Sequence, residues 1–374
     1  MKKLYFDYNA TTPVHHEVVR AINPYFTDAF GNPGCAHMHG VNACKAIAKA
    51  VSQVAGLINA AQEQIIFTSC ATESNNLVLF GLLEPGDELI ISAVEHPSIM
   101  APAQQLSSQG VIVKTAPVNS KGLIDPLEVV SMITPATKLV SIMLANNETG
   151  AIQPVAELGA YTRPMDVLLH TDAAQAVGKI PVNTDTTGVD FLTVAGHKMY
   201  APKGIGVLYV KNPELLNPMF FGGGQQNSIR PGTENVPYIA GLGRACELAD
   251  HDLHKEISRQ KNLGKILLQG LNSLGIDFMV HSEKALRLPN TLSIGFGGFR
   301  AGDILSDMIA MEISASAGAA CHGNSVHMSS VLQAMKVPTH YGLGTIRFSW
   351  GRMTSNNDIQ ELLSRLEHIF KNKR

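Results

Sequence analysis

Short apolar runs that alternate with longer segments of helical periodicity constrain the fold of this chain more than any other feature. The runs are rich in β-branched residues and are expected to be strands at 64–68, 88–92, 111–116, 138–144, 167–171, 191–194 and 206–210. Helical patterns fill most of the gaps, for example at 41–58, 74–83 and 101–109. Strands that alternate with helices predict an α/β fold, with a mainly parallel sheet covered on both faces.

The pattern changes after about residue 243. One long helix, or two in sequence, is expected at 245–274. It is followed by a short segment at 290–295, a helix at 303–310, a strand at 345–349 and an amphipathic helix at 357–371. A chain of 374 residues is long enough for two domains. We therefore expect a large domain at 14–250 and a smaller α+β domain made of 1–13 with 251–374.

Composition and charge narrow the class of protein. Hydrophobic residues make up 45% of the chain and charged residues 16%, which supports a folded core and argues against disorder. The formal net charge is -2 and no long run of Lys or Arg occurs, so a nucleic-acid partner is not expected. No signal-peptide core follows the N-terminal lysines, and no apolar stretch approaches the roughly 18 residues of a membrane span. The interpretation is a cytoplasmic protein without a membrane partner.

Five cysteines are scattered along the chain, at Cys35, Cys44, Cys70, Cys246 and Cys321. None forms a C-x-x-C pair, so neither a disulfide framework nor a structural metal site is expected. A free Cys is by default a small buried hydrophobe. Cys321 differs, because small residues surround it and His322 follows it, which fits a reactive thiolate. A buried Cys in a tight turn fits the same residues.

A small-residue turn follows the strand expected at 64–68 and leads into a helical pattern near Ala71 and Thr72. Free backbone N–H groups and the positive end of a helix dipole at such a turn suit an anion such as phosphate. An ordinary N-cap by Ser or Thr explains the same residues.

Asp172 and Lys198 each follow a further predicted strand. Ligands bind at the carboxyl ends of strands in open α/β sheets, where a carboxylate can pair with a cationic ring nitrogen. A lysine that loses its proton there can form a Schiff base. Alone, Asp172 is equally a helix N-cap and Lys198 a solvated loop lysine. Together with a phosphate cradle, however, they are the groups that pyridoxal 5'-phosphate (PLP) requires.

Ordered motifs over nearly the full length resemble class V aminotransferase-fold enzymes, specifically the cysteine desulfurases and selenocysteine lyases. The motifs are YFDYNATTP (5–13), GNP (31–33), ATESNN (71–76), VEH (94–96), ANNETG (145–150), HTDAAQ (170–175), GHK (196–198), PKG (202–204), GGGQ (222–225), RPGTEN (230–235), AAC (319–321) and IRFS (346–349). The resemblance implies the PLP-dependent transferase fold type I, with PLP held on Lys198.

The resemblance also assigns roles to residues around the cofactor. Asp172 would pair with the pyridine nitrogen, and His96 would stack on the ring and relay protons. Asn147 and Gln175 would approach the O3 side of the ring. The phosphate would be bound by Ala71, Thr72 and His197 and, from the second subunit of a homodimer, by Thr233.

Two residues would act on the substrate. Arg347 would clamp its α-carboxylate, with Asn147 nearby, and Cys321 would take its sulfur as a persulfide.

Three positions depart from the family pattern. Ala195 replaces a hydroxyl residue that contacts phosphate, Cys70 replaces a Gly, and Val41 replaces an Arg.

The predicted function is therefore a PLP-dependent cysteine desulfurase that converts L-cysteine to L-alanine and passes sulfur to an acceptor protein. Selenocysteine lyase, which acts on L-selenocysteine, is the alternative, because residues 191–198 and 221–243 look closer to that group. A catalytically silent scaffold is a third hypothesis, and the intact Lys198, Asp172 and Cys321 count against it.

Overall fold

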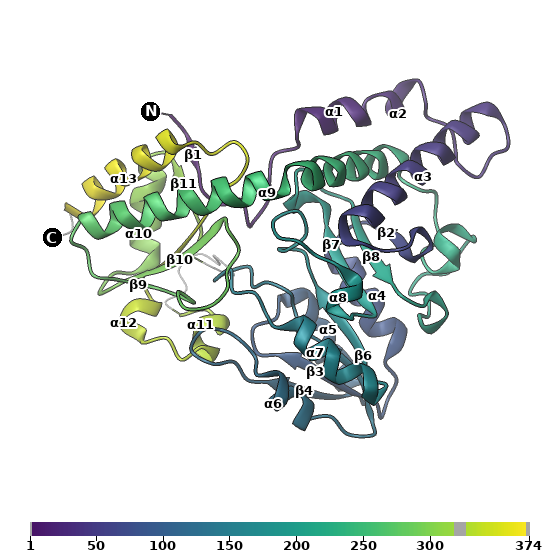
Figure 1. Cartoon of the computed structure of the whole chain (residues 1–374), viewed down its shortest axis with the longest axis horizontal. Helices are drawn as coiled ribbons and strands as arrows, with labels where there is room; N and C mark the ends of the chain where they lie inside the picture. Colours follow the sequence, from purple (N-terminus) through teal and green to yellow (C-terminus); the bar gives the residue numbers. More distant parts are fainter. Residues whose placement is uncertain (1, 318–326, 372–374) are drawn as a thin grey trace.

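The computed structural model describes residues 2–317 and 327–371. The described chain contains a seven-stranded, a three-stranded and a two-stranded sheet, and helices pack against the two larger ones (Figure 1). The strands are β1 (Leu4–Tyr5), β2 (Ile65–Thr68), β3 (Glu88–Ser92), β4 (Ile112–Ala116), β5 (Thr137–Ser141), β6 (Leu168–Asp172), β7 (Phe191–Ala195), β8 (Gly206–Val210), β9 (Phe278–Val280), β10 (Thr291–Phe296), β11 (Ile313–Ser314) and β12 (Thr345–Ser349).

The helices alternate with these strands over the first two thirds of the chain. The α-helices are α1 (His16–Ile22), α2 (Pro24–Thr27), α3 (Met38–Ile58), α4 (Ala71–Leu82), α5 (Pro97–Ser108), α6 (Pro126–Ser131), α7 (Val155–Thr162), α8 (Thr184–Thr187), α9 (Val236–Ser273), α10 (Ala301–Ala310), α11 (Ser330–Ala334), α12 (Thr339–Gly342) and α13 (Asn356–Lys371). Among these described helices, none is long and apolar enough to cross a membrane.

The large sheet has the strand order β2-β8-β7-β6-β5-β3-β4. Strands β3 to β7 pair in parallel, whereas β8 is antiparallel to both of its neighbours. The prediction of an α/β fold with a mainly parallel, mixed sheet is thus confirmed.

Period-two burial explains why helices cover both faces of this sheet. Ile65 and Phe67 pack into one hydrophobic cluster with residues of α3, α7 and α9. Ile66, between them, packs into a second cluster with residues of α4 and α5. Successive side chains of a strand point to opposite faces, so a continuous apolar run is buried on both.

One expected strand is too long. The strand expected at 138–144 ends at Ser141, because β3 pairs with the chain only as far as that residue. Beyond it, the backbone N–H groups of Ile142 and Leu144 still donate to His170 and Asp172 of β6. The chain therefore leaves the sheet gradually and arrives at residues 145–150 beside the end of β6.

A third hydrophobic cluster surrounds the antiparallel sheet β12-β10-β9. It includes residues of α10 and α13 and of the second half of α9. Figure 1 shows α9 as one long helix that runs from this region to the helices beside the large sheet. Leu4 and Phe6 belong to the same cluster, and β1 pairs in parallel with β11. The domain made of 1–13 with 251–374 stays a prediction. The expected boundary at residue 250 falls inside α9 and stays a prediction.

Candidate active site

The carboxyl ends of β3, β6 and β7 meet at one edge of the large sheet. Asp172 is the last residue of β6, and His96 caps the N-terminus of α5, shortly after β3. Lys198 ends the short 3-10 helix η3 (Gly196–Lys198), which follows β7 directly. Parallel strands bring their carboxyl ends to the same edge, which explains how residues over 100 positions apart converge here.

A chain of neutral hydrogen bonds joins Asp172 to His96. Asn75 of α4 donates from Nδ2 to Asp172 Oδ2 at 2.8 Å and to Ser98 Oγ at 2.8 Å. Ser98 Oγ in turn lies 2.8 Å from His96 Nδ1. The second carboxylate oxygen of Asp172 accepts from the backbone N–H of Ala174 at 2.9 Å. Asp172 is only 6% exposed, and both of its carboxylate oxygens accept hydrogen bonds from neutral donors.

The protonation of the His96 ring follows from its contacts. Nδ1 accepts from the backbone N–H of Ser98 at 3.1 Å, so the proton of the neutral ring is on Nε2. Burial is the main cause that lowers the pKa of His96. The Lys198 cation lowers this pKa further, while the Asp172 carboxylate opposes both effects. His96 is therefore a neutral ring with a donor on Nε2.

Lys198 has no acidic partner within salt-bridge distance among the described residues. Its Nζ donates to the backbone carbonyl of Asn9 at 2.8 Å. Burial is the largest cause that lowers the pKa of Lys198, to about 8, and the Arg347 cation adds to it, whereas Asp172 and Asp7 oppose it. An amine with such a pKa is unprotonated often enough near neutral pH to attack a carbonyl.

Asn9 holds the surroundings of Lys198 together. Its backbone N–H donates to Ser349 Oγ at 2.9 Å, and its Nδ2 donates to Thr291 Oγ1 at 2.9 Å and to the Asn147 carbonyl at 3.2 Å. Asn290 donates to its Oδ1 at 3.2 Å. This one residue thus ties the N-terminal segment to β10, β12 and the large sheet. Asn9 belongs to the motif YFDYNATTP, which by itself predicts no role for this residue.

Gln175 lies on the same network. Its Nε2 donates to the Asn9 carbonyl at 2.9 Å, and its Oε1 accepts from Lys179 Nζ at 2.7 Å. Lys179 also donates to Asn9 Oδ1 at 3.2 Å. The contact of Gln175 with the expected cofactor stays a prediction. Lys179 was not predicted, because a single Lys after a helical turn carries no signal of burial.

Arg347 of β12 is 5% exposed and comes close to this network from the small antiparallel sheet. It forms a salt bridge with Asp7, with Nη2 2.6 Å from Oδ1, and its Nη1 donates to the Asn147 carbonyl at 2.9 Å. Its Nε is buried and has no hydrogen-bond partner among the described residues. Arg347 and Asn147 are thus adjacent, as the resemblance implied, and their role in substrate binding stays a prediction.

The expected phosphate site lies at the N-terminus of α4. Cys70 is the N-cap residue, in extended conformation, and its side chain does not cap the helix. The first N–H groups of a 12-residue helix, at Ala71 and Thr72, therefore face outward without a side-chain cap. Thr72 and His96 line one pocket together.

His197 is the middle residue of the short helix η3, directly after β7. Its Nδ1 is 3.1 Å from Thr11 Oγ1, and its carbonyl accepts from the hydroxyl of Thr12 at 2.9 Å. Burial, followed by the nearby lysines, lowers the pKa of His197 to about 4. A neutral ring can donate one hydrogen bond to a phosphate, which stays the predicted role.

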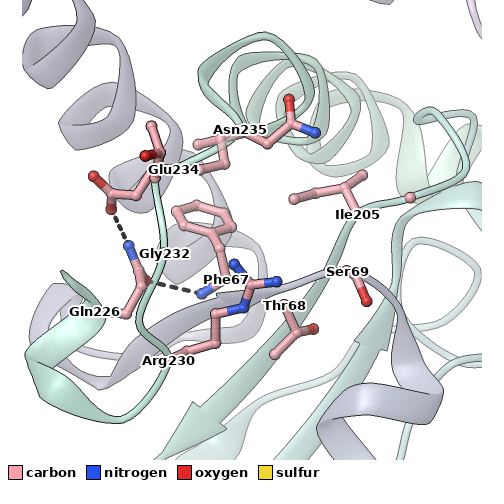
Figure 2. A pocket seen from close by; sticks show the side chains of 12 residues that line it. Phe67, Thr68, Ser69, Ile205, Gln226, Arg230, Gly232, Glu234 and Asn235 are labelled. Carbon is pink, nitrogen blue, oxygen red and sulfur yellow. Dashed lines mark hydrogen bonds between the residues drawn. The ribbon is translucent and has the colours of Figure 1, made fainter. Parts of the chain in front are cut away.

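Thr233 and Ser69, the latter in the turn before α4, line a separate pocket. Figure 2 shows this pocket, with Ser69 labelled. Within it, Arg230 forms a salt bridge with Glu73 at 2.9 Å. Gln226 hydrogen-bonds to Glu234 and accepts from the backbone N–H of Phe67, as the dashed lines in Figure 2 mark. Thr233 itself is exposed and is not brought into the pocket of Thr72 and His96.

The remaining predicted positions differ in what can be said of them. Cys321, the expected sulfur acceptor, lies outside the described residues. Ala195 is the buried last residue of β7, and Cys70 is partly buried beside Gly206. Val41 is an exposed residue of α3.

These residues fit PLP by their chemistry. Asp172 offers a buried carboxylate, Lys198 an amine of lowered pKa, and α4 a helix N-terminus, all at one edge. Two buried polar atoms near them, Asn75 Oδ1 and Arg347 Nε, have no partner among the described residues. A ring nitrogen, an aldehyde carbon and a phosphate are the complementary groups.

Comparisons with known proteins agree with this fit. The family described as Aminotransferase class-V matches residues 4–362. Cysteine desulfurase IscS of Dictyoglomus turgidum is 38% identical over 377 residues, which span 100% of this chain and 96% of that protein. A NifS-like protein of known structure has a TM-score of 0.93 and 33% identity over 99% of this chain and 100% of its own. SspA, solved in complex with cysteine, has a TM-score of 0.82 and 34% identity over 92% of this chain and 98% of its own. The chain therefore belongs to the class V aminotransferase family, whose members depend on PLP.

Proposed function

We propose that the chain is a PLP-dependent cysteine desulfurase, which converts L-cysteine to L-alanine and receives the sulfur on Cys321. The observation that carries this proposal is the convergence of Lys198, Asp172 and His96 at one sheet edge, in a chain similar over its full length to cysteine desulfurases. The complex of the similar protein SspA with cysteine supports the choice of substrate.

The residues of the chain divide the work of binding and proton transfer. PLP, when bound, supplies an electron sink for the bond-breaking steps. Asp172 would keep the ring nitrogen protonated, since a buried carboxylate stabilises an adjacent cation. Lys198 Nζ would hold the cofactor and take the Cα proton of the substrate, which its lowered pKa favours. His96, a neutral ring with its proton on Nε2, would stack on the cofactor ring and relay protons.

Cys321 would perform the sulfur transfer. Its thiolate attacks the substrate sulfur, so that an S–S bond forms while the C–S bond of the substrate breaks. The electron pair of the C–S bond stays on Cβ, which gains a proton and becomes the methyl group of alanine. The persulfide on Cys321 then passes its outer sulfur to an acceptor protein.

The test combines two measurements. Borohydride reduction of the PLP-bound enzyme, followed by peptide mapping, should label Lys198, and a label on another lysine would overturn the assignment. Cys321→Ala should then lose release of sulfur from L-cysteine and keep appreciable turnover of L-selenocysteine, since selenium leaves more readily. Full desulfurase activity in Cys321→Ala would exclude the persulfide step. Wild-type turnover of selenocysteine alone would show a selenocysteine lyase.

We further propose that the enzyme is a homodimer in which Thr233 serves the phosphate site of the other subunit. Thr233 is exposed, and the aromatic side chains of Phe220 and Phe221 nearby in sequence are 52% and 90% exposed. Exposed aromatic residues of this size are typical of surfaces that a partner covers. Light scattering of the active enzyme tests the proposal, and a fully active monomer would contradict it.

A further inference from the structure

Lys179 is a buried amine that the proposed chemistry does not use. Lys179 and Lys198 line one small cavity. Lys179 is 9% exposed, yet it has no acidic partner within salt-bridge distance in the described part of the chain. Its Nζ donates to two amide oxygens, Gln175 Oε1 at 2.7 Å and Asn9 Oδ1 at 3.2 Å. Burying an amine against neutral acceptors lowers the stability of the folded chain, so we expect Lys179 to have a functional role at this position.

The contacts of Lys179 fix which way the Gln175 amide points. A lysine amine bonded in this manner donates, so the end of the amide that faces it must be the oxygen. The other end faces the Asn9 carbonyl at 2.9 Å, and a backbone carbonyl only accepts, so that end must be the nitrogen. Both partners thus require the same orientation of the amide.

This orientation leaves a donor beside Lys198. The Asn9 carbonyl accepts from both Gln175 Nε2 and Lys198 Nζ, so the amide nitrogen and the amine lie on the same oxygen. Gln175 Nε2 carries two hydrogens, and within residues 2–317 and 327–371 it donates to one acceptor, the Asn9 carbonyl. The second hydrogen is free to meet a ligand held on Lys198.

We propose that Lys179 is a positioning residue that holds the Gln175 amide with its nitrogen toward the cofactor, where it donates to the phenolic ring oxygen of PLP. The inference rests on the proposed attachment of PLP to Lys198 and deepens it. A donor at that oxygen stabilises its anionic form and weakens its hold on the neighbouring imine proton. If the amide were reversed, its oxygen would face the phenolate and repel it.

The consequence is measurable in the absorbance of the bound cofactor, which changes when the imine loses its proton. Lys179→Gln and Lys179→Met form a matched pair, because both are neutral and of similar length and only Gln can donate to Gln175. Lys179→Met should raise the pH midpoint of the absorbance change by about one unit, the effect of one hydrogen bond to a charged group. Lys179→Gln should leave the midpoint near that of the wild type.

Gln175→Leu separates positioning from a direct effect of charge. It should raise the midpoint as Lys179→Met does, and the double variant should show no further rise, because Lys179 acts through Gln175. The other charged or titratable groups near Lys198 are unchanged in all variants. They are Asp172, Asp7, Arg347, His96 and His197, together with Tyr8, Tyr200, Glu256 and Arg352, which line the cavity that Lys198 shares with Lys179. Additive shifts, or equal shifts in Lys179→Gln and Lys179→Met, would overturn the proposal.

Two controls keep the outcomes distinct. Absence of the PLP absorbance band in the wild type would contradict the proposed function itself, whereas a normal band with an unshifted midpoint in Gln175→Leu would contradict this inference alone. Circular dichroism and thermal unfolding of the apo variants check the fold. If Lys179→Met does not fold, the comparison of Lys179→Gln with Gln175→Leu still decides, because equal upward shifts in the two would overturn the proposal.

Discussion

The parallel strands of the seven-stranded sheet begin at one side of the sheet, the amino edge, and end at the other, the carboxyl edge. The two edges differ in how they stabilise buried charges. At the amino edge, Glu88 is the first residue of β3 and pairs with Lys114 of β4 at 2.7 Å. Two threonine hydroxyls donate to the same carboxylate. Asp190, just before β7, pairs with Lys211 at 3.3 Å. Charges at this edge have partners of opposite sign.

At the carboxyl edge, three buried groups, Asp172, Lys198 and Glu95, are instead held by neutral groups, although the ion pairs Arg347–Asp7 and Arg230–Glu73 lie nearby. Asp172 accepts from an amide and a backbone N–H, and Lys198 donates to a carbonyl. Glu95, after the other end of β3, accepts from Ser92 Oγ at 2.6 Å and from the Met143 N–H at 2.9 Å. Burial is the main cause that raises the pKa of Glu95, to about 8.

The comparison indicates that one sheet places charges that stabilise the fold at one edge and groups that can exchange protons at the other. An ion pair stabilises both charges where they are, and neither partner is then ready to exchange a proton near neutral pH. Groups held by dipoles keep pKa values that burial has moved toward neutrality, as at Lys198 and Glu95. Substitutions at the amino edge should therefore change stability, and substitutions at the carboxyl edge should change activity.

The largest effect is expected for Lys198→Met. Loss of the amine that holds PLP and moves the Cα proton should lower turnover of L-cysteine by roughly 10³-fold or more. The matched substitution at the amino edge, Lys114→Met, should leave turnover near that of the wild type and lower the free energy of unfolding. Steady-state kinetics and denaturant unfolding measure the two effects, and equal losses of turnover would contradict the division between the edges.

Stability provides a further check on Lys198→Met. The pKa of Lys198 is lowered from 10.5 to about 8 on folding, so the folded chain binds fewer protons than the unfolded chain between these values. The free energy of unfolding of the wild-type apo protein should gain a rising contribution from this group across that pH window. The advantage of Lys198→Met in stability should thus be largest below pH 8 and shrink above it.

Arg347 tests whether a salt bridge at the active site follows the rule of the amino edge. If Arg347 clamps the substrate carboxylate, Arg347→Ala should cost about 2–4 kcal/mol in substrate recognition, seen as a higher KM, with PLP content unchanged. Arg347→Lys keeps the charge but not the two-pronged geometry and should recover only part of the loss. Loss of PLP with an unchanged KM would instead make Arg347 a structural partner of Asp7.

A smaller effect is expected for Glu88→Gln. Hydrogen bonds from Lys114 are the main cause that lowers the pKa of Glu88. This carboxylate therefore contributes stability above the pKa of its unfolded state, and the contribution is lost as the pH falls through the folded value. Glu88→Gln should lower the free energy of unfolding at pH 7 by about 1–2 kcal/mol and leave activity unchanged. The deficit should shrink in acid, as urea unfolding at several pH values can show.

The smallest effect is expected for Glu95→Gln, and its sign is opposite. Because the pKa of Glu95 is raised from 4.5 to about 8, the folded chain binds more protons in this range, and the wild type loses stability as the pH rises through it. At pH 5 the variant should match the wild type within about 0.5 kcal/mol. At pH 8 and above it should be the more stable of the two. A deficit that grows with pH would show that Glu95 is ionised and paired.

Much of the fold was predictable because the strands are continuous buried runs. The predicted strands at 88–92, 206–210 and 345–349 have the same bounds as β3, β8 and β12. Helices α4 and α5 begin three and four residues earlier than expected, because their first turns contain small or polar residues and Pro97 rather than an apolar pattern. Strands β1 and β11 are two residues long and pair across most of the chain, so no local pattern marks them.

The candidate site was predictable only in part. Asp172 and Lys198 follow strong strand signals, so their position at one edge could be inferred from the sequence. The chain of Asn75 and Ser98 between Asp172 and His96 could not, because amide and hydroxyl contacts across 23 and 97 positions leave no periodic pattern. Lys179 was missed for the same reason, since its bond to Asn9 spans 170 positions.

The central position of Asn9 has a consequence for the order of biosynthesis. Its bonds reach Lys198, Thr291 and Ser349, the last of them 340 positions away. Because the ribosome makes the N-terminal end first, Asn9 cannot bind Ser349 until most of the polypeptide has been translated. A chain that stops before β12 lacks the Ser349 hydroxyl that binds Asn9 and the Arg347 guanidinium that pairs with Asp7. The surroundings of Lys198 are therefore expected to be completed only after β12 has been made.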